Sequence, residues 1–375
     1  MGYIKFQYDR LKSFCNEAFE NFGFSPDESR IITDVLLLSD LYGIESHGIQ
    51  RMVRYHMDIK KSLVDVKAKH EVVFETPVTA VIDGHDGMGQ IIGHRAMKIA
   101  IEKARKAGVG IVTVRNSNHY GIAGYYTKLA CDEGLIGFSC TNSEAIMVPT
   151  FGRLAMLGSN PIACSMPAEP YPFSFDASTT VVTRGKLEIY NKLEKPLPEG
   201  WALNKDGQNS TDAADILKNI VNNNGGGIMP LGGNSEIYGS HKGYGFGMIC
   251  EIFSSVLSLG MTSNYAMKGN KGGICHGFAA INPSAFGDAE SIKKHLSNYL
   301  QELRKSPKAE GEQRIYTHGE KEIAAFEDRM RNGIPVNENT MLELLDLCDY
   351  LKMDFSAYFG DYRPQKRSKT FENNY

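Results

Sequence analysis

The 375-residue chain lacks the long hydrophobic runs, the excess of charge and the paired cysteines that mark several classes of protein. No apolar run approaches the roughly 18 residues of a membrane-spanning helix, so we expect no membrane association. A formal net charge of -3 offers no basic surface, and a nucleic-acid partner is therefore not expected. Seven cysteines without a CxxC pair, and an N-terminus without an apolar signal segment, favour a reduced, cytoplasmic protein.

The sequence also lacks the short motifs of several enzyme classes. Its ten histidines form no HExxH and no closely spaced pair typical of zinc ligands, so no metal is expected. Neither a GxSxG nucleophile elbow nor a P-loop is present. The chemistry that remains is proton transfer combined with the binding of anions.

The hydrophobic pattern predicts a mixed α/β fold. Residues 71–285 alternate short apolar runs with amphipathic segments, which indicates a central mixed sheet with covering helices. Residues 1–70 and 286–375 are mostly helical in pattern, so we expect a helical domain formed from both ends of the chain. The predicted strands cover 76–83, 109–114, 135–140 and 171–176, and the predicted helices between them cover 92–108 and 122–134.

Three further helices are predicted from local signals. Ser25, Pro26 and Glu28 have the spacing of a capped helix start, and apolar residues recur helically after them. A second helix is expected over 46–61. A third, over 243–260, is apolar nearly all round and is therefore predicted to be buried.

The glycine-rich stretch GHDGMGQIIGH follows a predicted strand and precedes a helix, as a dinucleotide-binding turn would. Gly87, Gly89 and Gly93 give GxGxxxG, one residue longer than the standard fingerprint. The acidic residue expected about 20 positions later is missing, because TVRNSN stands there. We therefore interpret this stretch as a turn and a helix start and not as a Rossmann site.

The segment ESHGIQRMVRY can place His47, Arg51 and Tyr55 on one helix face, because residues four apart share a face. Such a stripe offers a titrating imidazole, a carboxylate-binding guanidinium and a phenol. Ser46 can cap this helix or bind substrate. The alternative is a solvated face with an incidental histidine.

A second histidine, His119, follows a predicted strand within RNSNHYGIAGYY. Polar neighbours can fix the tautomer of its imidazole, which acid–base catalysis requires. The alternative is a histidine that hydrogen-bonds the backbone of a turn.

Polar residues follow several of the other predicted strands. The stretch 141–168 has the hydroxyls, amides and glycines of a ligand groove. Asp176 ends a strand, and Ser178 and Thr179 can cap the next helix, where a pyrophosphate can bind. Lys242 lies at a helix start, where it can contact an anion. Ordinary helix caps are the alternative interpretation.

Taken together, the motifs resemble one known family. ESHGIQRMVRY, DGMGQIIGHRAM, RNSNHYGIAGYY, GSNPIA, FDAST, PEGWALNKDG, HKGYGF and GIPV occur in the order found in the malate/L-lactate dehydrogenases that lack a Rossmann fold. The resemblance covers about residues 3–340. It implies a homodimer with active sites near the subunit interface, and a groove built on a mixed sheet for NAD, with NADP as the alternative.

The resemblance also implies roles for individual residues. It gives the acid–base role to His47 and His119, of which we favour His119 as the proton carrier, with Asp176 as the next candidate. Ser46, Arg51 and Tyr55 match the substrate side. The cofactor side is expected to comprise Gly121, Thr141, Asn142, Ser143, Asn160, Pro161, Asp176, Ala177, Ser178, Thr179, Lys242, Gly319 and Glu320.

The expected reaction is oxidation of a 2-hydroxy acid, with L-malate to oxaloacetate as the leading case. The alternatives are reduction of another 2-oxo or cyclic imino acid, a non-redox hydroxy-acid lyase, and a nucleotide-binding regulator. The chain departs from the family pattern at FDAST, at Glu144 and at His318. Glu144 bears on the charge of the substrate, and His318 bears on the outer contacts of the cofactor.

Overall fold

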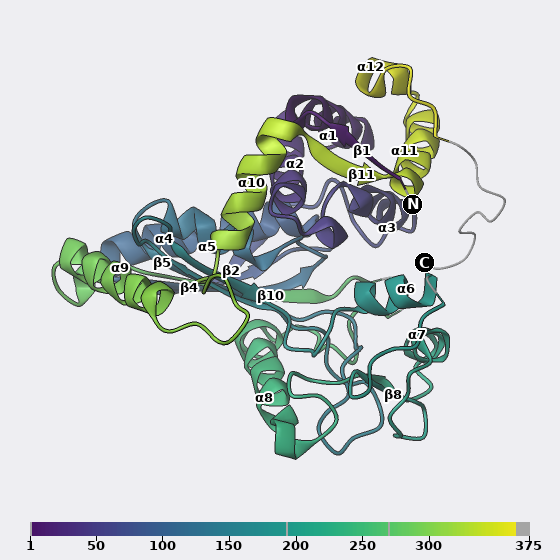
Figure 1. Ribbon diagram of the computed structural model, residues 1–375. Coiled ribbons are helices and arrows are strands. Elements are labelled where there is room, and N and C mark those ends of the chain that lie inside the picture. Colours follow the sequence, from purple (N-terminus) through teal and green to yellow (C-terminus); the bar gives the residue numbers. More distant parts are fainter. Residues whose placement is uncertain (1, 193, 269–270, 365–375) are drawn as a thin grey trace.

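The centre of the molecule is a seven-stranded mixed sheet, seen in a computed structural model that describes residues 2–192, 194–268 and 271–364 (Figure 1). The strand order is β2-β3-β4-β10-β5-β6-β7, and only the pair β3–β4 is parallel. This topology confirms the predicted mixed α/β class and is not the doubly wound parallel sheet of a Rossmann fold. The strands are β2 (Glu71–Glu75), β3 (Thr79–Asp83), β4 (Val109–Ser117), β5 (Ile136–Thr141), β6 (Ile162–Met166), β7 (Phe173–Ala177) and β10 (Ile274–Ile281).

Helices cover both faces of this sheet. The helices α4 (Gly89–Ala107) and α5 (Ala123–Cys131) pack on one face, above the sheet in Figure 1. On the other face lies α8 (Ser240–Glu251), which continues into the π-helical turn η4 (Ile252–Val256) against β4, β5 and β10.

The prediction that residues 243–260 form a buried helix is wrong for half of its surface. Gly247, Cys250 and Ser254 are buried toward the sheet. The opposite face is uncovered in the single chain, and its apolar side chains are between 38 and 50% exposed. They are Phe246, Met248, Ile249, Ile252, Val256 and Leu257.

The two ends of the chain meet in a helical region with a common core. Phe14 and Leu36 pack in one cluster with Leu344 and Phe359. The helix α2 (Pro26–Leu41) begins as predicted, because the Ser25 hydroxyl and the Glu28 carboxylate cap each other's backbone. The other elements are β1 (Tyr3–Phe6), α1 (Tyr8–Phe22), α3 (Met52–Lys60), β11 (Ile334–Asn337), α11 (Glu338–Leu351) and α12 (Phe355–Phe359).

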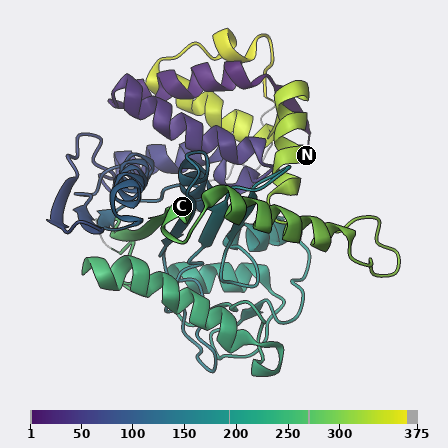
Figure 2. The same cartoon turned by 90° about the vertical axis from the view of Figure 1, so that its left-hand side faces the viewer.

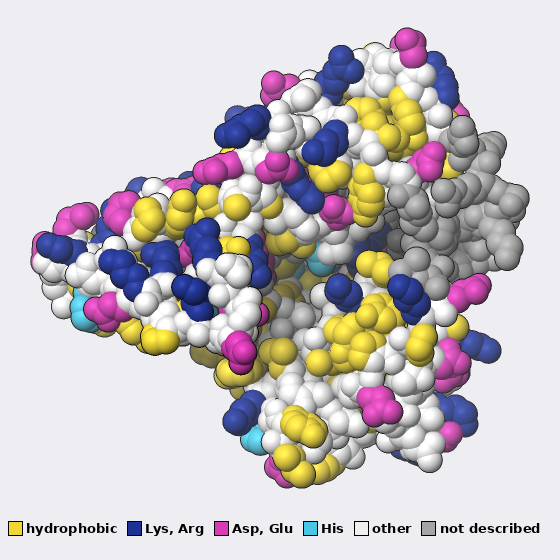
Figure 3. Space-filling view, viewed as in Figure 1, with side chains coloured by type: hydrophobic (Ala, Val, Ile, Leu, Met, Phe, Trp, Pro, Cys, Tyr) yellow, Lys and Arg dark blue, Asp and Glu magenta, His cyan; other side chains and the backbone are white. Residues whose placement is uncertain are grey.

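A third group of elements lies beyond β7. It holds α6 (Arg184–Lys192), β8 (Ala202–Leu203), α7 (Ala213–Asn222) and β9 (Gly227–Ile228), with its own cluster around Leu187, Ile216 and Ile228. The surface is hollowed between this lower group and the helical region (Figure 3). The two-domain division predicted from the pattern stays a prediction.

The remaining elements lie outside these groups. The helix α9 (Ala289–Lys305) projects from the body of the molecule, and α10 (Glu320–Asn332) packs against α2 (Figure 2). Short turns are η1 (Glu45–His47), η2 (Ile49–Arg51), η3 (Glu236–Tyr238) and η5 (Pro283–Ala285). Among the helices of the described residues, none combines the length and apolarity needed to cross a membrane.

Candidate active site

The sheet topology gathers the predicted polar segments at one edge. The strands β4, β5 and β7 run in the same direction, because two antiparallel pairings separate β4 from β5 and two separate β5 from β7. Their carboxyl ends therefore lie together. His119 follows β4, Ser143 follows β5, and Asp176 is the penultimate residue of β7. The predicted strand ends thus define one candidate site.

The imidazole of His119 is held by two partners at one nitrogen. The Tyr55 hydroxyl lies 2.9 Å from Nδ1 of His119, and the backbone N–H of Gly121 points at the same atom from 3.4 Å. Gly121 has a φ of +83°, and a methyl group there would lie 2.4 Å from Val35, so glycine is required. Because Nδ1 is occupied, only Nε2 remains to face a substrate.

The segment that carries His47 is not the continuous helix predicted over 46–61. Two 3-10 turns, η1 and η2, precede α3, and Gly48 between them has an extended backbone. The cause is the buried carboxylate of Asp40, which accepts the N–H of Ile49 at 2.7 Å. A methyl group at Gly48 would lie 1.9 Å from Asp40 Oδ1. The i, i+4 stripe therefore does not form.

Folding nevertheless brings the two histidines together. The rings of His47 and His119 stack with centroids 5.5 Å apart. The Ser46 hydroxyl lies 2.9 Å from Nδ1 of His47, so Ser46 contacts the imidazole and does not cap a helix. Burial, followed by the charges of Arg51 and Arg54, lowers the pKa of His47 to about 3.

Two guanidinium groups charge this site. Arg51 donates from Nε to the carbonyl of Ser46. Arg54 lies one turn further along and has a 3.5 Å contact with Asp58. Burial, followed by the charge of Arg54, lowers the pKa of His119 well below its ordinary value. Both imidazoles are therefore neutral at pH 7, and the guanidinium groups of Arg51 and Arg54 act on them through their charge.

Tyr55, expected on the substrate side, lies behind His119. Its side chain is 1% exposed and its hydroxyl contacts Nδ1 of His119. Burial raises the pKa of Tyr55 to about 12, so the phenol keeps its proton. In this position Tyr55 orients the imidazole.

The Asp176 side chain contacts the amino end of α5, the helix that begins a few residues after His119. Its carboxylate accepts the N–H of Gly124 at 2.7 Å and does not cap the helix after β7. Although the residue keeps an exposed surface, crowding by protein atoms raises the pKa of its carboxyl to about 6. A negatively charged carboxylate near the amino end of a helix is stabilised by the helix dipole.

Several predicted cofactor residues use their side chains within the protein. Thr141 bonds His276, and Asn142 bonds the backbone at Met261 and Cys275. Asn160 is fully buried and donates to Glu251. Thr179 donates to the carbonyl of Ser159, and the Pro161 carbonyl accepts from the thiol of Cys250. These residues shape the edge of the sheet.

The other predicted cofactor residues are more accessible. Ser143, Ala177 and Ser178 are half-buried at the same edge. Lys242 is exposed in the first turn of α8. This helix packs on Leu231 through Gly243, and the N–H of Leu231 donates to the carbonyl of Thr179 at the sheet edge. Gly319 packs on Ser174 of β7.

Glu320 anchors the chain that follows α9. Its carboxylate is 4% exposed and accepts from Thr317, Arg304 and Arg314. Although burial opposes ionisation, these hydrogen bonds lower the pKa of Glu320 to about 2. The carboxylate is therefore engaged within the chain. The ring of His318 packs edge-on against Phe173 and Phe175.

The sequence analysis missed residues that bear on the site. Arg54 precedes Tyr55 and could have been found from the charge beside the predicted stripe. Arg184 could not have been found from the sequence, because it lies 40 positions from Glu144, to whose carboxylate it donates at 3.2 Å. Its neighbour Gly185 lies against Ser46, since a methyl group there would be 4.0 Å from the Ser46 Cβ. The unusual carboxylate of Glu144 is thus paired with a guanidinium that also contacts Glu188.

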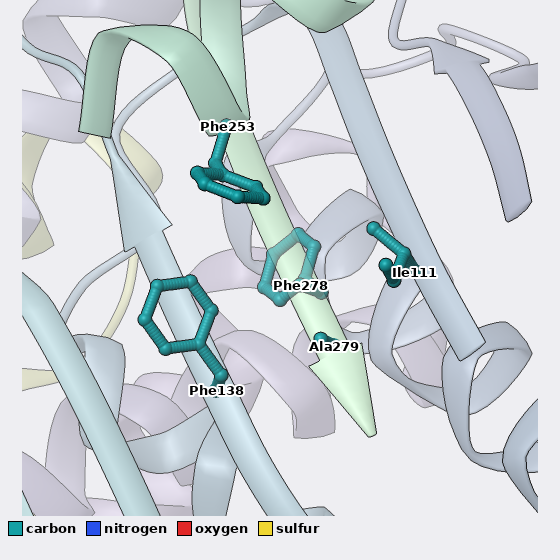
Figure 4. Close-up of a pocket in the computed structure, with 6 residues that line it drawn as sticks. Ile111, Phe138, Phe253, Phe278 and Ala279 are labelled. Atoms are coloured by element: carbon teal, nitrogen blue, oxygen red, sulfur yellow. The ribbon is translucent and has the colours of Figure 1, made fainter. Parts of the chain in front are cut away.

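A small apolar cavity lies elsewhere, between η4 and the sheet. It holds about 40 Å³ and is lined by Ile111, Phe138, Phe253, Phe278 and Ala279, together with Gly277 (Figure 4). No ionisable side chain lines it, and it is a packing gap with room for about one water. Within the described residues, no cluster of three metal-ligating side chains occurs.

Comparison with known proteins identifies the family. The sequence matches the malate/L-lactate dehydrogenase family over residues 6–345. The chain belongs to this family. Malate dehydrogenase of Pyrococcus horikoshii is 42% identical over 349 residues, covering 92% of this chain and 95% of that protein. L-sulfolactate dehydrogenase of Methanocaldococcus jannaschii is 36% identical over 354 residues, covering 92% and 97%.

The fold agrees with this assignment. The crystal structure of malate dehydrogenase from Entamoeba histolytica superposes with a TM-score of 0.90 at 36% identity, covering 94% of this chain and 99% of that chain. The family predicted from the motifs is confirmed, and with it the reaction class of a hydroxy-acid dehydrogenase. The roles of the individual residues stay predictions.

Proposed function

We propose that the chain is a cytoplasmic NAD(P)-dependent dehydrogenase that interconverts L-malate and oxaloacetate. The observation that carries the proposal is the stacked pair of neutral imidazoles, His47 and His119, next to two guanidinium groups. A dianionic 2-hydroxy acid suits this combination, because Arg51 and Arg54 match its two carboxylates. All seven cysteines are free thiols, as expected in a reducing compartment.

His119 is the proposed proton carrier. Its Nε2 is the nitrogen left over by Tyr55 and Gly121. His47, fixed by Ser46, is proposed to bind the substrate oxygen or carboxylate. Arg51 and Arg54 align the substrate, so that the free energy of binding compensates for the entropy that the substrate loses when it is oriented for reaction.

The residues at the sheet edge fit a nicotinamide cofactor. Ser143 and Ser178 offer neutral hydroxyls at the same sheet edge as His119, which suits a carboxamide and sugar hydroxyls. Lys242, in the first turn of a 12-residue helix, suits a phosphate. When bound, the nicotinamide exchanges a hydride with C2 of the substrate. NAD is the expected form, with NADP as the alternative.

A homodimer is part of the proposal. The uncovered face of α8 and η4 is a contiguous apolar surface, of the kind that soluble monomers rarely expose. A second copy packed on this face would cover it. Light scattering at micromolar concentration should give about twice the 41.5 kDa chain mass. A fully active monomer would contradict the proposal.

The test is a panel of 2-oxo acids assayed with NADH and NADPH in parallel. Oxaloacetate should be reduced fastest, ahead of pyruvate and a sulfonated 2-oxo acid. Absence of NAD(P)H binding by fluorescence would favour a hydroxy-acid lyase. Binding without turnover of any 2-oxo acid would favour a regulator.

A further inference from the structure

Gln90 is a buried polar side chain that the chemistry above does not use. It is 0% exposed and lies in the first turn of α4. The preceding residue, Gly89, packs on the loop of His119, since a methyl group there would lie 2.2 Å from the Asn118 carbonyl and 2.6 Å from that of His119. Gln90 is close enough to Tyr55 to favour the ionised phenol. It therefore lies behind the Tyr55–His119 contact.

The amide of Gln90 lies near the Tyr55 hydroxyl, but the two groups do not reach the geometry of a hydrogen bond. Within the described part of the chain, neither Oε1 nor Nε2 of Gln90 has a partner at hydrogen-bonding geometry. A buried amide without partners costs about 1–3 kcal/mol, so such a group is normally hydrogen-bonded to the protein or to an ordered water molecule. A water molecule, which makes about three hydrogen bonds in protein interiors, is the ligand of matching size and chemistry.

The neighbours of His119 fix where its proton lies. The backbone N–H of Gly121 can only donate, and it points at Nδ1. Nδ1 is therefore an acceptor in the neutral ring, and the Tyr55 hydroxyl at 2.9 Å donates to it. The single ring proton of His119 is then on Nε2, toward the substrate.

A doubly protonated ring is unfavourable in this place. Burial and the charges of Arg54, His47 and Arg51 all lower the pKa of His119. A neutral imidazole that gives up its Nε2 proton must regain one at Nδ1, or it becomes an imidazolate. Tyr55 is 1% exposed, so it in turn needs a buried donor.

We propose that Gln90 and one water molecule bound to it complete a proton relay through Tyr55 to His119. During reduction, Nε2 of His119 gives its proton to the substrate oxygen, the Tyr55 hydroxyl proton moves to Nδ1, and a proton of the water moves to the Tyr55 oxygen. One proton enters from solvent for each 2-oxo group reduced, and oxidation runs the chain in reverse. The proposal rests on the proposed function, and within it Gln90 is a positioning residue.

The position of the proton is tested without turnover. Nitrogen NMR of protein labelled with ¹⁵N-histidine, compared with a His119→Gln variant for assignment, reports the tautomer of His119 at pH 7. The expected result is a neutral ring protonated on Nε2. A ring protonated on Nδ1, or on both nitrogens, would overturn the relay.

The role of Gln90 is tested by a double-mutant cycle with Tyr55. Gln90→Met and Tyr55→Phe should each lower kcat for 2-oxo-acid reduction about tenfold or more, with KM nearly unchanged. Because both act in one chain, the double variant should be little worse than either single variant. A double variant whose loss in kcat is the product of the two single losses, or variants in which only KM changes, would overturn the proposal.

A matched control separates this role from packing. Thr113 of β4 is also buried and its hydroxyl also lacks a partner in the described chain, but it does not contact Tyr55 in any described interaction. Thr113→Val should leave kcat unchanged, and thermal melts should show that all variants fold. If the wild type turns over no 2-oxo acid, the proposed function fails, while the NMR result still decides the proton position.

Discussion

The two histidines of the site are anchored in different ways. His47 is fixed by the residue before it, Ser46, through a contact between neighbours in the sequence. His119 is fixed by Tyr55, 64 positions away, through a contact that only the folded chain makes. The difference teaches that the orientation of His119 is a property of the whole fold. This supports giving the directional task, proton transfer, to His119 and the binding task to His47.

The largest expected effect comes from removing His119. His119→Ala should lower kcat by about 10² to 10⁴, which is the usual contribution of an acid–base group. NADH affinity should change little, because the imidazole contacts the Tyr55 side chain and the backbone N–H of Gly121, and that N–H remains when the imidazole is removed. Steady-state kinetics and NADH fluorescence titration measure the two quantities. A variant that loses NADH binding but keeps kcat would reverse our comparison.

Arg51 should give the next largest effect. Arg51→Lys keeps the charge but loses both the two-pronged grip on a carboxylate and the Nε contact with Ser46. The expected cost is about 2 to 4 kcal/mol in kcat/KM. The loss should be larger with oxaloacetate than with the uncharged-tail substrate pyruvate. A variant with near-normal kcat/KM for oxaloacetate would remove Arg51 from the site.

His47 should affect binding more than turnover. His47→Ala removes a ring that stacks on His119 but does not hold its Nδ1, so KM should rise about tenfold with kcat changed less. Initial rates over a range of oxaloacetate concentrations separate the two. If His47→Ala lost kcat as strongly as His119→Ala, the two histidines would act as a unit and the division of tasks would fail.

The parts of the fold that the sequence predicted are those set by local signals. Ser25 and Glu28 are three residues apart, so their mutual cap forms from neighbouring atoms, and α2 begins where expected. The edge that gathers His119, Ser143 and Asp176 was predicted only through strand ends and motif order. The hydrophobic pattern did not reveal the central strand β10. Its residue His276 hydrogen-bonds both Thr141 of β5 and Ser117 of β4.

The failures share a cause, which is a contact between distant segments. Residues 46–61 have a helical pattern, but the buried carboxylate of Asp40 takes the N–H of Ile49 and interrupts the helix. The face of α8 was expected to be covered because its composition is apolar, and composition does not show where a chain provides a cover. The contact of the Tyr55 hydroxyl with His119 likewise joins distant segments, which the spacing within 46–61 could not show.

Asp40 should give the smallest effect on turnover and the clearest effect on stability. Asp40→Asn keeps an oxygen for the N–H of Ile49, so the loop of His47 and kcat should persist. Burial raises the pKa of Asp40 from 3.8 to about 8 in the folded protein, despite the opposing hydrogen bond of Ile49 and charge of Arg329. The folded state thus retains a proton that the unfolded chain releases, so this residue makes wild-type stability fall as pH rises from about 4 to 8.

Asparagine cannot ionise, and the variant should lack this loss. Its stability relative to wild type should therefore be greater at pH 8 than at pH 5, as measured by urea unfolding at both pH values. An Asp34→Asn variant, on the same helix but only half-buried, should show a weaker pH dependence of the same sign, because burial also raises its pKa. A pH-independent difference for Asp40→Asn would mean that the carboxylate is ionised in the fold. The loop of His47 would then be held by a charge, whereas Nδ1 of His119 is held by the neutral Tyr55 hydroxyl and the Gly121 N–H.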